Sequence, residues 1–130
     1  MMEMKFYKCD ICGQIVAVVK ETGAPLVCCD QNMRELIPGS VDASIEKHVP
    51  VITIEGDKVT VTVGSAFHPM TKEHCIEWIS LQTKCGNQRK EISCGAEPKA
   101  CFCLCEGDEV LAAYAYCNLH GLWKAEVKAD

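Results

Sequence analysis

The stretch Lys58-Val59-Thr60-Val61-Thr62-Val63 alternates between polar and apolar residues at every position. Because successive side chains of a strand point to opposite faces of a sheet, this period of two predicts a β-strand with one buried face. Residues 49–55 are rich in valine, isoleucine and threonine, and Gly56-Asp57 between the two stretches is typical of a turn. Residues 49–63 therefore predict two strands joined by a turn.

The same kind of pattern continues towards the end of the chain. Further strands are predicted at residues 76–83, 100–105, 110–116 and 122–127, with turns at Gly86-Asn87 and Gly107-Asp108. Residues 110–115 are rich in alanine and are also compatible with a helix on propensity alone. Short strands between glycine-containing turns indicate an all-β fold, with an antiparallel β-sandwich over residues 38–130.

Composition limits the size of the fold and the class of partner. The chain has 130 residues, of which 48% are hydrophobic, and this suits one compact domain or two small ones. With 18 acidic and 13 basic residues and no lysine–arginine cluster, it lacks the positive surface that binds nucleic acid. No apolar run reaches the roughly 18 to 20 residues of a membrane span, and residues 1–9 show no signal peptide. We therefore expect a cytoplasmic protein with no nucleic-acid or membrane partner.

Cysteine is unusually abundant. Eleven cysteines in 130 residues is about the density of a disulfide scaffold. However, the number is odd, and nothing in the sequence directs the chain to an oxidising compartment. Because cysteines at this density in a reducing compartment more often bind metal, we expect metal sites.

Residues 1–37 are expected to form a separate small domain. The turn-forming Pro38-Gly39-Ser40 follows them, and all four histidines come later in the chain. So short a segment cannot fold on an apolar core alone, and a bound metal would stabilise it. Its four cysteines offer a tetrahedral set of sulfurs: Cys9, Cys12, Cys28 and Cys29.

The spacing of these cysteines sets requirements for the backbone. In Cys9-Asp10-Ile11-Cys12-Gly13, two intervening residues let the chain turn so that both sulfurs face one ion, and the glycine allows the positive φ that such a turn often needs. In extended backbone, the adjacent Cys28 and Cys29 would point to opposite faces. Both can reach one metal only where the backbone kinks. The spacing alone leaves zinc and iron equally possible.

The four histidines lie at predicted strand ends or in loops. His48 opens a strand, and His68 and His74 flank one loop. His120 follows Cys117 in a Cys-x-x-His pair at the end of another strand. A β-scaffold can gather such positions at one edge. Imidazoles with one thiolate suit zinc, iron, copper or nickel, and the residues alone do not choose among these metals.

Together, these motifs resemble the desulfoferrodoxin family of two-iron superoxide reductases. Cys-x-x-Cys-Gly followed by Cys-Cys is similar to the family's desulforedoxin-like, rubredoxin-type domain. Four further segments resemble its neelaredoxin-like catalytic domain: Glu46-Lys47-His48-Val49-Pro50, His68-Pro69-Met70, Glu73-His74 with Glu77-Trp78-Ile79, and Cys117-Asn118-Leu119-His120-Gly121-Leu122-Trp123-Lys124. The resemblance covers nearly the whole chain, and it is specific because the motifs occur jointly and in order.

The resemblance implies a small Fe(Cys)4 domain at residues 1–37 and an immunoglobulin-like catalytic β-sandwich at residues 38–130. It implies two mononuclear non-haem irons per chain. The ligands of the first iron would be Cys9, Cys12, Cys28 and Cys29. The ligands of the second would be His48, His68, His74 and His120 in the equatorial plane and Cys117 in an axial position, with the sixth position open.

The activity implied by the resemblance is one-electron reduction of superoxide to hydrogen peroxide, which detoxifies superoxide without producing oxygen. Family members form homodimers, receive electrons from rubredoxin and work in the cytoplasm. By the same resemblance, Lys47 attracts superoxide and helps to supply a proton, and Glu46 is the sixth ligand in the ferric resting state. One alternative is an iron-binding electron-transfer module without turnover, and a zinc structural protein is another.

Six cysteines fall outside these motifs: Cys75, Cys85, Cys94, Cys101, Cys103 and Cys105. The simplest interpretation is free, reduced thiols that pack as small apolar residues. A third metal site or a redox-sensitive thiol cluster is the alternative. Alternation along residues 101–105 predicts three thiols on one strand face. Trp78 and Trp123 are expected in the core rather than at a metal.

Overall fold

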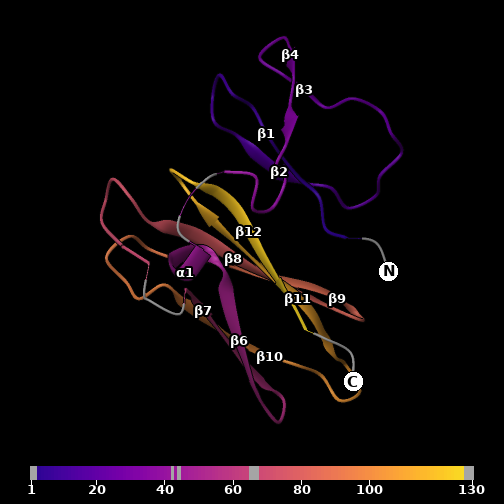
Figure 1. Cartoon of the computed structure of the whole chain (residues 1–130). Helices are drawn as coiled ribbons and strands as arrows, with labels where there is room; N and C mark the ends of the chain where they lie inside the picture. Colours follow the sequence, from indigo (N-terminus) through magenta and orange to yellow (C-terminus); the bar gives the residue numbers. More distant parts are fainter. Residues whose placement is uncertain (1–2, 42, 44, 65–67, 128–130) are drawn as a thin grey trace. The chain divides into compact units, whose positions relative to one another are not determined.

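The chain divides into two compact units, Met1–Ile37 and Pro38–Asp130. The computed structural model describes residues 3–41, 43, 45–64 and 68–127. Strands dominate both units in this part of the chain (Figure 1).

The first unit is built from short strands. They are β1 (Phe6–Lys8), β2 (Ile15–Ala17), β3 (Val27–Cys28), β4 (Gln31–Asn32) and β5 (Arg34–Glu35). β1 pairs antiparallel with β2 and β5, and β3 pairs with β4 as a separate hairpin. Among the described residues of this unit, the buried apolar side chains are Phe6, Cys9, Met33 and Leu36. So small an apolar core does not stabilise a folded unit by itself, and a bound metal or another cross-link is needed.

The second unit is a two-layered antiparallel sandwich. Its elements are α1 (Ile45–His48), β6 (Pro50–Glu55), β7 (Lys58–Val63), β8 (Ile76–Thr83), β9 (Gly86–Glu91), β10 (Lys99–Cys103), β11 (Val110–Cys117) and β12 (Gly121–Glu126). One sheet has the order β10-β7-β6 and the other β12-β11-β8-β9. Figure 1 shows the two sheets as separate layers, with α1 at the end where β6 begins. The predicted all-β sandwich is confirmed.

The alternation in β7 sets one side of the core. Val59, Val61 and Val63 have no exposed surface, whereas the residues between them are half-buried. Phe102 of β10 and Leu81 of β8 pack in the same cluster. Full burial of a large apolar side chain contributes roughly 1.5–3 kcal/mol. The sandwich is therefore held by its own apolar interior.

The alanine-rich residues 110–117 form strand β11 rather than a helix. β11 lies between β8 and β12, and it pairs antiparallel with both. Ala113 and Ala115 have no exposed surface. Packing between two neighbouring strands outweighs the helical propensity of alanine here, because β-propensity depends strongly on context.

Two elements differ from the sequence-based expectation. His48 does not open a strand but ends helix α1, whose turn is closed by the Val49 N–H donating to the Ile45 carbonyl at 3.0 Å. The helix ends there because the residue before Pro50 is disfavoured in helical backbone. The second difference is β9, which begins at the predicted Gly86 turn and pairs with β8 at the edge of its sheet. Its polar sequence shows no apolar alternation, since an edge strand does not need to bury a face.

The described residues contain no helix that is both long enough and apolar enough to cross a membrane.

Candidate metal centres

The Cys-x-x-Cys-Gly turn of the first unit is closed by backbone hydrogen bonds. The Gly13 N–H donates to the Cys9 carbonyl at 2.9 Å, and the Cys9 N–H donates to the Gln14 carbonyl at 2.9 Å. Gly13 has a φ of 83°, which confirms the positive value predicted for this position. The Cys12 N–H points at Cys9 Sγ, 3.5 Å away. The turn thus presents both sulfurs on one side.

The backbone is kinked where the two cysteines are adjacent. Cys29 has a φ of 54° and Asp30 a φ of 60°, values that are uncommon for residues other than glycine. As a result, Cys28 Sγ lies 3.6 Å from Cys12 Sγ and 3.9 Å from Cys29 Sγ. The kink that adjacent ligands require is therefore present.

The four sulfurs of the first unit lie within 4.8 Å of one another: Cys9, Cys12, Cys28 and Cys29. Backbone N–H groups of Cys12 and Ile11 donate to Cys9 and lower its pKa to about 6. Hydrogen bonding with the Cys12 thiol raises the pKa of Cys28 to about 12. A bound cation would favour the thiolate form at every position. Four convergent thiolates fit tetrahedral iron or zinc.

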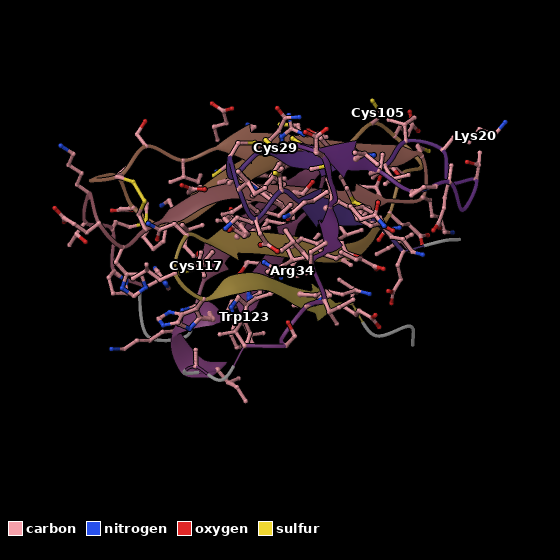
Figure 2. All side chains as sticks on the ribbon, turned by 90° about the horizontal axis from the view of Figure 1, so that it is seen from above. Lys20, Cys29, Arg34, Cys105, Cys117 and Trp123 are labelled. Atoms are coloured by element: carbon pink, nitrogen blue, oxygen red, sulfur yellow. A yellow bond between two sulfur atoms is a disulfide. The ribbon has the colours of Figure 1, made fainter. Side chains whose placement is uncertain are left out.

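Three segments of the second unit bring the histidines together. Helix α1 ends at His48, and the loop leading into β8 carries His68 and His74. The hairpin between β11 and β12 carries Cys117 and His120. Figure 2 shows Cys117 close to a group of nitrogen-containing rings, with Trp123 nearby.

The Cys-x-x-His-Gly motif is a β-hairpin with a three-residue loop. Cys117 pairs with Gly121 across the hairpin, and Gly121 has a φ of 80°, as such loops favour. The register between β11 and β8 shifts between Tyr116 and Cys117, and a bulge of this kind re-aims side chains beside functional sites. Cys117 Sγ lies 3.9 Å from His120 Nδ1.

The four imidazoles form a nearly square ring. From His48 to His68, His74, His120 and back, neighbouring ring centroids lie 4.6, 4.7, 5.0 and 4.9 Å apart. The planes of these neighbours meet at 77°, 83°, 75° and 89°. Across the ring, the centroids of His48 and His74 lie 6.4 Å apart and their planes differ by 28°. The ligand atoms of His48, His74, His120 and Cys117 lie within 4.8 Å of one another. His68 is outside this group but adjoins it, because its Nε2 is 3.1 Å from that of His48.

The ring nitrogen atoms at this centre are placed to bind a shared cation. The His68 Nδ1–H donates to the Pro69 carbonyl at 2.6 Å, so a neutral His68 presents a bare lone pair at Nε2. That Nε2 lies 3.1 Å from His48 Nε2, which lies 3.1 Å from His120 Nδ1. His74 Nε2 is buried without a hydrogen-bond partner among the described residues. A metal ion would satisfy these converging lone pairs, and the donor set fits iron.

The surroundings of His68 and His74 favour the neutral imidazole, which is the form that binds metal. Burial lowers the pKa of His68 to about 4, although the Pro69 carbonyl acts in the opposite direction. Burial also lowers the pKa of His74, and the nearby His120 and Lys47 add to this effect. Protons therefore compete weakly with a metal for these nitrogens.

Cys117 is completely buried. Burial raises the pKa of its thiol, while N–H groups of Leu119 and His120 donate to the sulfur and oppose this increase. A neighbouring metal cation would favour the thiolate. The sulfur thus has a protein environment that is dry but supplies hydrogen bonds.

Lys47 and Glu46 are the two residues expected to act beside the metal. Lys47 is exposed and lies next to His48, outside the group of converging ligand atoms. Its charge still lowers the pKa of His74, so its field reaches the site. The side chain of Glu46 lies outside the described residues.

Trp123 lies in the core, as predicted, and it also packs on two of the predicted ligands. It is buried, and its ring stacks on His48 with centroids 5.0 Å apart. Its Nε1–H donates to the His120 carbonyl at 3.0 Å. The available signal was its position three residues after His120, where the β12 strand returns past the hairpin loop. Trp78 instead stacks on Tyr116.

Asn118 is a further site residue, outside the predicted set of ligands and catalytic residues. Its Oδ1 accepts from the Cys75 N–H at 3.0 Å, and its Nδ2 donates to the Glu73 carbonyl at 2.9 Å. It thus ties the hairpin loop that carries Cys117 to the loop that carries His74. Its position between Cys117 and His120 was the only sequence signal for this role.

The six additional cysteines are not all free thiols. Cys75 and Cys94 form a disulfide, which corrects the simplest expectation for these two. The other four are free: Cys85, Cys101, Cys103 and Cys105. Strand β10 ends at Cys103, so Cys105 is not on the strand face predicted for three thiols.

Comparisons with known proteins agree with this geometry. The family model described as "Desulfoferrodoxin" matches residues 40–126, and that described as "Desulfoferrodoxin, N-terminal domain" matches residues 2–36. A desulfoferrodoxin from Syntrophotalea carbinolica is 45% identical over 95% of this chain and 97% of its own length. The crystal structure of the superoxide reductase from Treponema pallidum is similar with a TM-score of 0.82 and 38% identity, covering 96% of this chain and 100% of that one. A single-iron superoxide reductase from Giardia intestinalis is 37% identical with a TM-score of 0.55, covering 65% of this chain and 99% of that one.

Proposed function

The chain belongs to the desulfoferrodoxin family, and we propose that it is a superoxide reductase that acts at the four-histidine centre. The observation that carries this function is the nearly square ring of four imidazoles beside one buried thiol. In the reaction, superoxide takes up one electron and two protons and becomes hydrogen peroxide. No oxygen is produced, so the reaction is a reduction rather than a dismutation.

Each unit has its own metal in this proposal. Residues 1–37 are a desulforedoxin-like domain that holds iron on four cysteines: Cys9, Cys12, Cys28 and Cys29. Residues 38–130 are the catalytic domain, and its iron ligands are His48, His68, His74, His120 and Cys117. Iron bound at the second centre supplies the electron and an open position for superoxide.

The protein closes one side of the catalytic ring and leaves another accessible. Cys117 has no exposed surface, whereas His74 and His120 are only half-buried. A small anion therefore reaches the centre past these two half-buried imidazoles. Four neutral imidazoles and one thiolate leave a ferrous centre with a net charge of +1, which attracts an anion.

Lys47 and Glu46 act beside this centre. The exposed ammonium of Lys47 attracts superoxide and helps to deliver a proton, and its influence on His74 supports this role. Glu46, two residues before His48 in the sequence, would bind the oxidised iron and release it on reduction. Trp123 positions His48 and His120 through the stacking and the hydrogen bond described above.

The remaining assignments concern the cellular setting. We expect the chain to work in the cytoplasm, where it detoxifies superoxide and takes its electrons from rubredoxin or a similar small donor. The exposed thiols of Cys12 and Cys29 and the exposed apolar Ile11 and Val27 support the first centre as an entry point for electrons. We also propose a homodimer, and the unpaired edge of β6, with its exposed Val51, offers a surface for it.

The stoichiometry of the reaction tests the proposed function. The iron-loaded chain, kept reduced by an electron donor, should release one hydrogen peroxide for each superoxide consumed. A dismutase would release one for every two and would also release oxygen. A ratio of one to two, measured with a peroxide assay and an oxygen electrode, would contradict reduction.

Anion binding separates the enzyme from an electron-transfer module with closed metal sites. An accessible position on the ferric second centre should bind azide and shift its visible absorption. Cys117→Ser should abolish this response, whereas Cys12→Ser, which alters only the first centre, should retain it. A spectrum that no small anion changes would favour the electron-transfer module.

A further inference from the structure

The Cys75–Cys94 disulfide is a feature that the metal centres do not explain. Cys75 is fully buried at the start of β8, whereas Cys94 is exposed in the connection between β9 and β10. The bond therefore links a buried residue, which directly follows the ligand loop, to an exposed residue. Figure 2 shows the bond in yellow.

The segment around Cys94 holds the ligand loop at two points. The disulfide fixes the end of the loop, because Cys75 directly follows the ligand His74. The Gly95 N–H donates to the Met70 carbonyl at 2.8 Å, near the other end of the loop. Figure 1 shows the loop leading into β8 and the connection between β9 and β10 at the same end of the sandwich. Opening the disulfide would leave the hydrogen bond as the remaining attachment that the structure gives between Cys94-Gly95 and this loop.

Cys75 also contacts the other ligand-bearing segment. Its N–H donates to Asn118 Oδ1 at 3.0 Å, and the Asn118 N–H donates to the Cys75 carbonyl at 3.2 Å. Asn118 directly follows the thiolate ligand Cys117. Cys75 therefore lies between the His74 loop and the Cys117 hairpin and is hydrogen-bonded to the latter.

We propose that Cys75 and Cys94 are a redox-active thiol pair that hydrogen peroxide closes into a clamp on the catalytic metal centre. This inference rests on the proposed function, because the oxidant is the product of superoxide reduction. Cys94 is the cysteine that meets peroxide first, because it is the exposed residue of the pair. Cys75 is the resolving sulfur, because it is buried beside it.

The reaction balances without another oxidant. The Cys94 thiolate attacks one peroxide oxygen, the O–O bond breaks, and a sulfenic acid and one water form after protonation. The Cys75 sulfur then attacks the Cys94 sulfur, the S–O bond breaks, and a second water leaves. In sum, two thiols lose two electrons and two protons, and one peroxide becomes two waters. A dithiol reductant reverses the closure by exchange.

The clamp acts on ligand retention. With the pair closed, His74 is held close to the other three imidazoles. With the pair open, the loop separates from the centre more often and iron escapes faster. Groups that hold a metal ligand in place commonly change metal affinity by about 10- to 100-fold, so we expect iron loss to a chelator to be about tenfold faster when the pair is reduced.

Peptide mapping tests the closure directly. Cleavage after lysine and arginine puts Cys75 in peptide 73–84 and Cys94 in peptide 91–99, each with a single cysteine. The full iron-loaded chain is reduced with dithiothreitol without air, freed of reductant, treated with one equivalent of peroxide and alkylated. The two peptides should appear cross-linked in the wild type and in the control Cys85→Ser, which removes another exposed thiol, but not in Cys94→Ser. If both peptides are alkylated after peroxide, or peroxide joins other cysteines instead, the proposal is wrong.

Chelator challenge tests the consequence. Iron release should be about tenfold slower from the peroxide-treated wild type than from the reduced wild type, and Cys94→Ser should release iron at the fast rate under both conditions. Equal rates in the reduced and the peroxide-treated wild type would overturn the clamp. Because peroxide is added directly, this result is independent of turnover. If the pair closes with added peroxide but superoxide yields no peroxide, the proposed function fails while the thiol chemistry stands.

Discussion

The two metal-binding units hold their ligands in different ways. In the second unit, the ligand segments extend from a sandwich in which Val61 and Leu81 are completely buried. In the first unit, the strands are two or three residues long, and the thiols of Cys12 and Cys29 are exposed. The sandwich can therefore place its histidines before a metal binds, whereas the first unit depends on its metal.

The pKa values of the predicted ligands also differ between the two units. Burial already lowers the pKa of His68 to about 4 and keeps it ready for a metal. In the first unit, by contrast, the pKa is about 6 at Cys9 and about 12 at Cys28. A bound cation would favour the thiolate form of both Cys9 and Cys28. One metal thus completes a fold, while the other occupies a site that the fold has prepared.

Removing the metals should produce the largest difference in stability between the two units. Structural metal binding by small cysteine sites is worth about 10–16 kcal/mol, so the metal-free first unit should lose its structure. The sandwich should remain folded because its core does not involve the metal. Hydrogen exchange of the full chain, with and without metal, measures this: protection should vanish in residues 3–37 and persist in β7, β8 and β11. Equal loss in both units would contradict the comparison.

Truncating a buried side chain of the sandwich core should have the next largest effect on stability. Leu81→Ala removes a fully buried side chain and should lower the free energy of unfolding by about 2–5 kcal/mol. The control Val19→Ala changes a fully exposed side chain of the first unit and should cost less than about 0.5 kcal/mol. Urea unfolding of the iron-loaded chain gives both values. A loss below 1 kcal/mol for Leu81→Ala would show that metal, not the core, holds the sandwich.

Acid should destabilise the metal-free sandwich through its buried histidines. Because the pKa of His68 falls from an ordinary 6.5 to about 4 on folding, the unfolded state binds its proton more tightly. The contribution to stability is present above about pH 6.5 and is lost as the pH falls towards 4. Melting temperatures of wild type and His68→Gln, measured across this range, isolate the effect: the wild type should lose more. A parallel decline of the two would contradict it.

Some of this organisation could be predicted from the sequence, and some could not. Valine alternation at residues 59–63 predicted the core strand, because a strand with one buried face has a period of two. The Cys-x-x-Cys-Gly spacing and the Cys-Cys pair predicted the positive φ of Gly13 and the kink at Cys29, since both follow from local geometry. The family prediction is likewise confirmed by both family models.

What escaped prediction depends on contacts between distant segments. The stacking of Trp123 on His48 and the disulfide between Cys75 and Cys94 join residues that only the folded sheets bring together. Strand β9 escaped because an edge strand of polar residues has no apolar period to detect. The helix ending at His48 is a single turn, too short for a periodic signal.

The smallest expected effect is on the rate at which superoxide reaches the four-histidine centre. Lys47→Ala should slow superoxide capture by roughly threefold to tenfold at low ionic strength, because it removes an attracting charge. The difference should shrink as salt screens the field. Lys58→Ala, which removes an exposed lysine in β7, is the matched control and should leave the rate unchanged. Pulse radiolysis gives these rates, and an unchanged rate and salt dependence for Lys47→Ala would rule out its role.

The central claim is that the chain holds two separate irons, and metal content with the visible spectrum tests it most directly. Protein purified without air and then oxidised should contain two irons per chain and show sulfur-to-iron charge-transfer bands from two distinct sites. Cys12→Ser should remove only the bands of the first site, and Cys117→Ser only the band of the second. A colourless protein with zinc at both sites, or a single substitution that removes every band, would contradict the account.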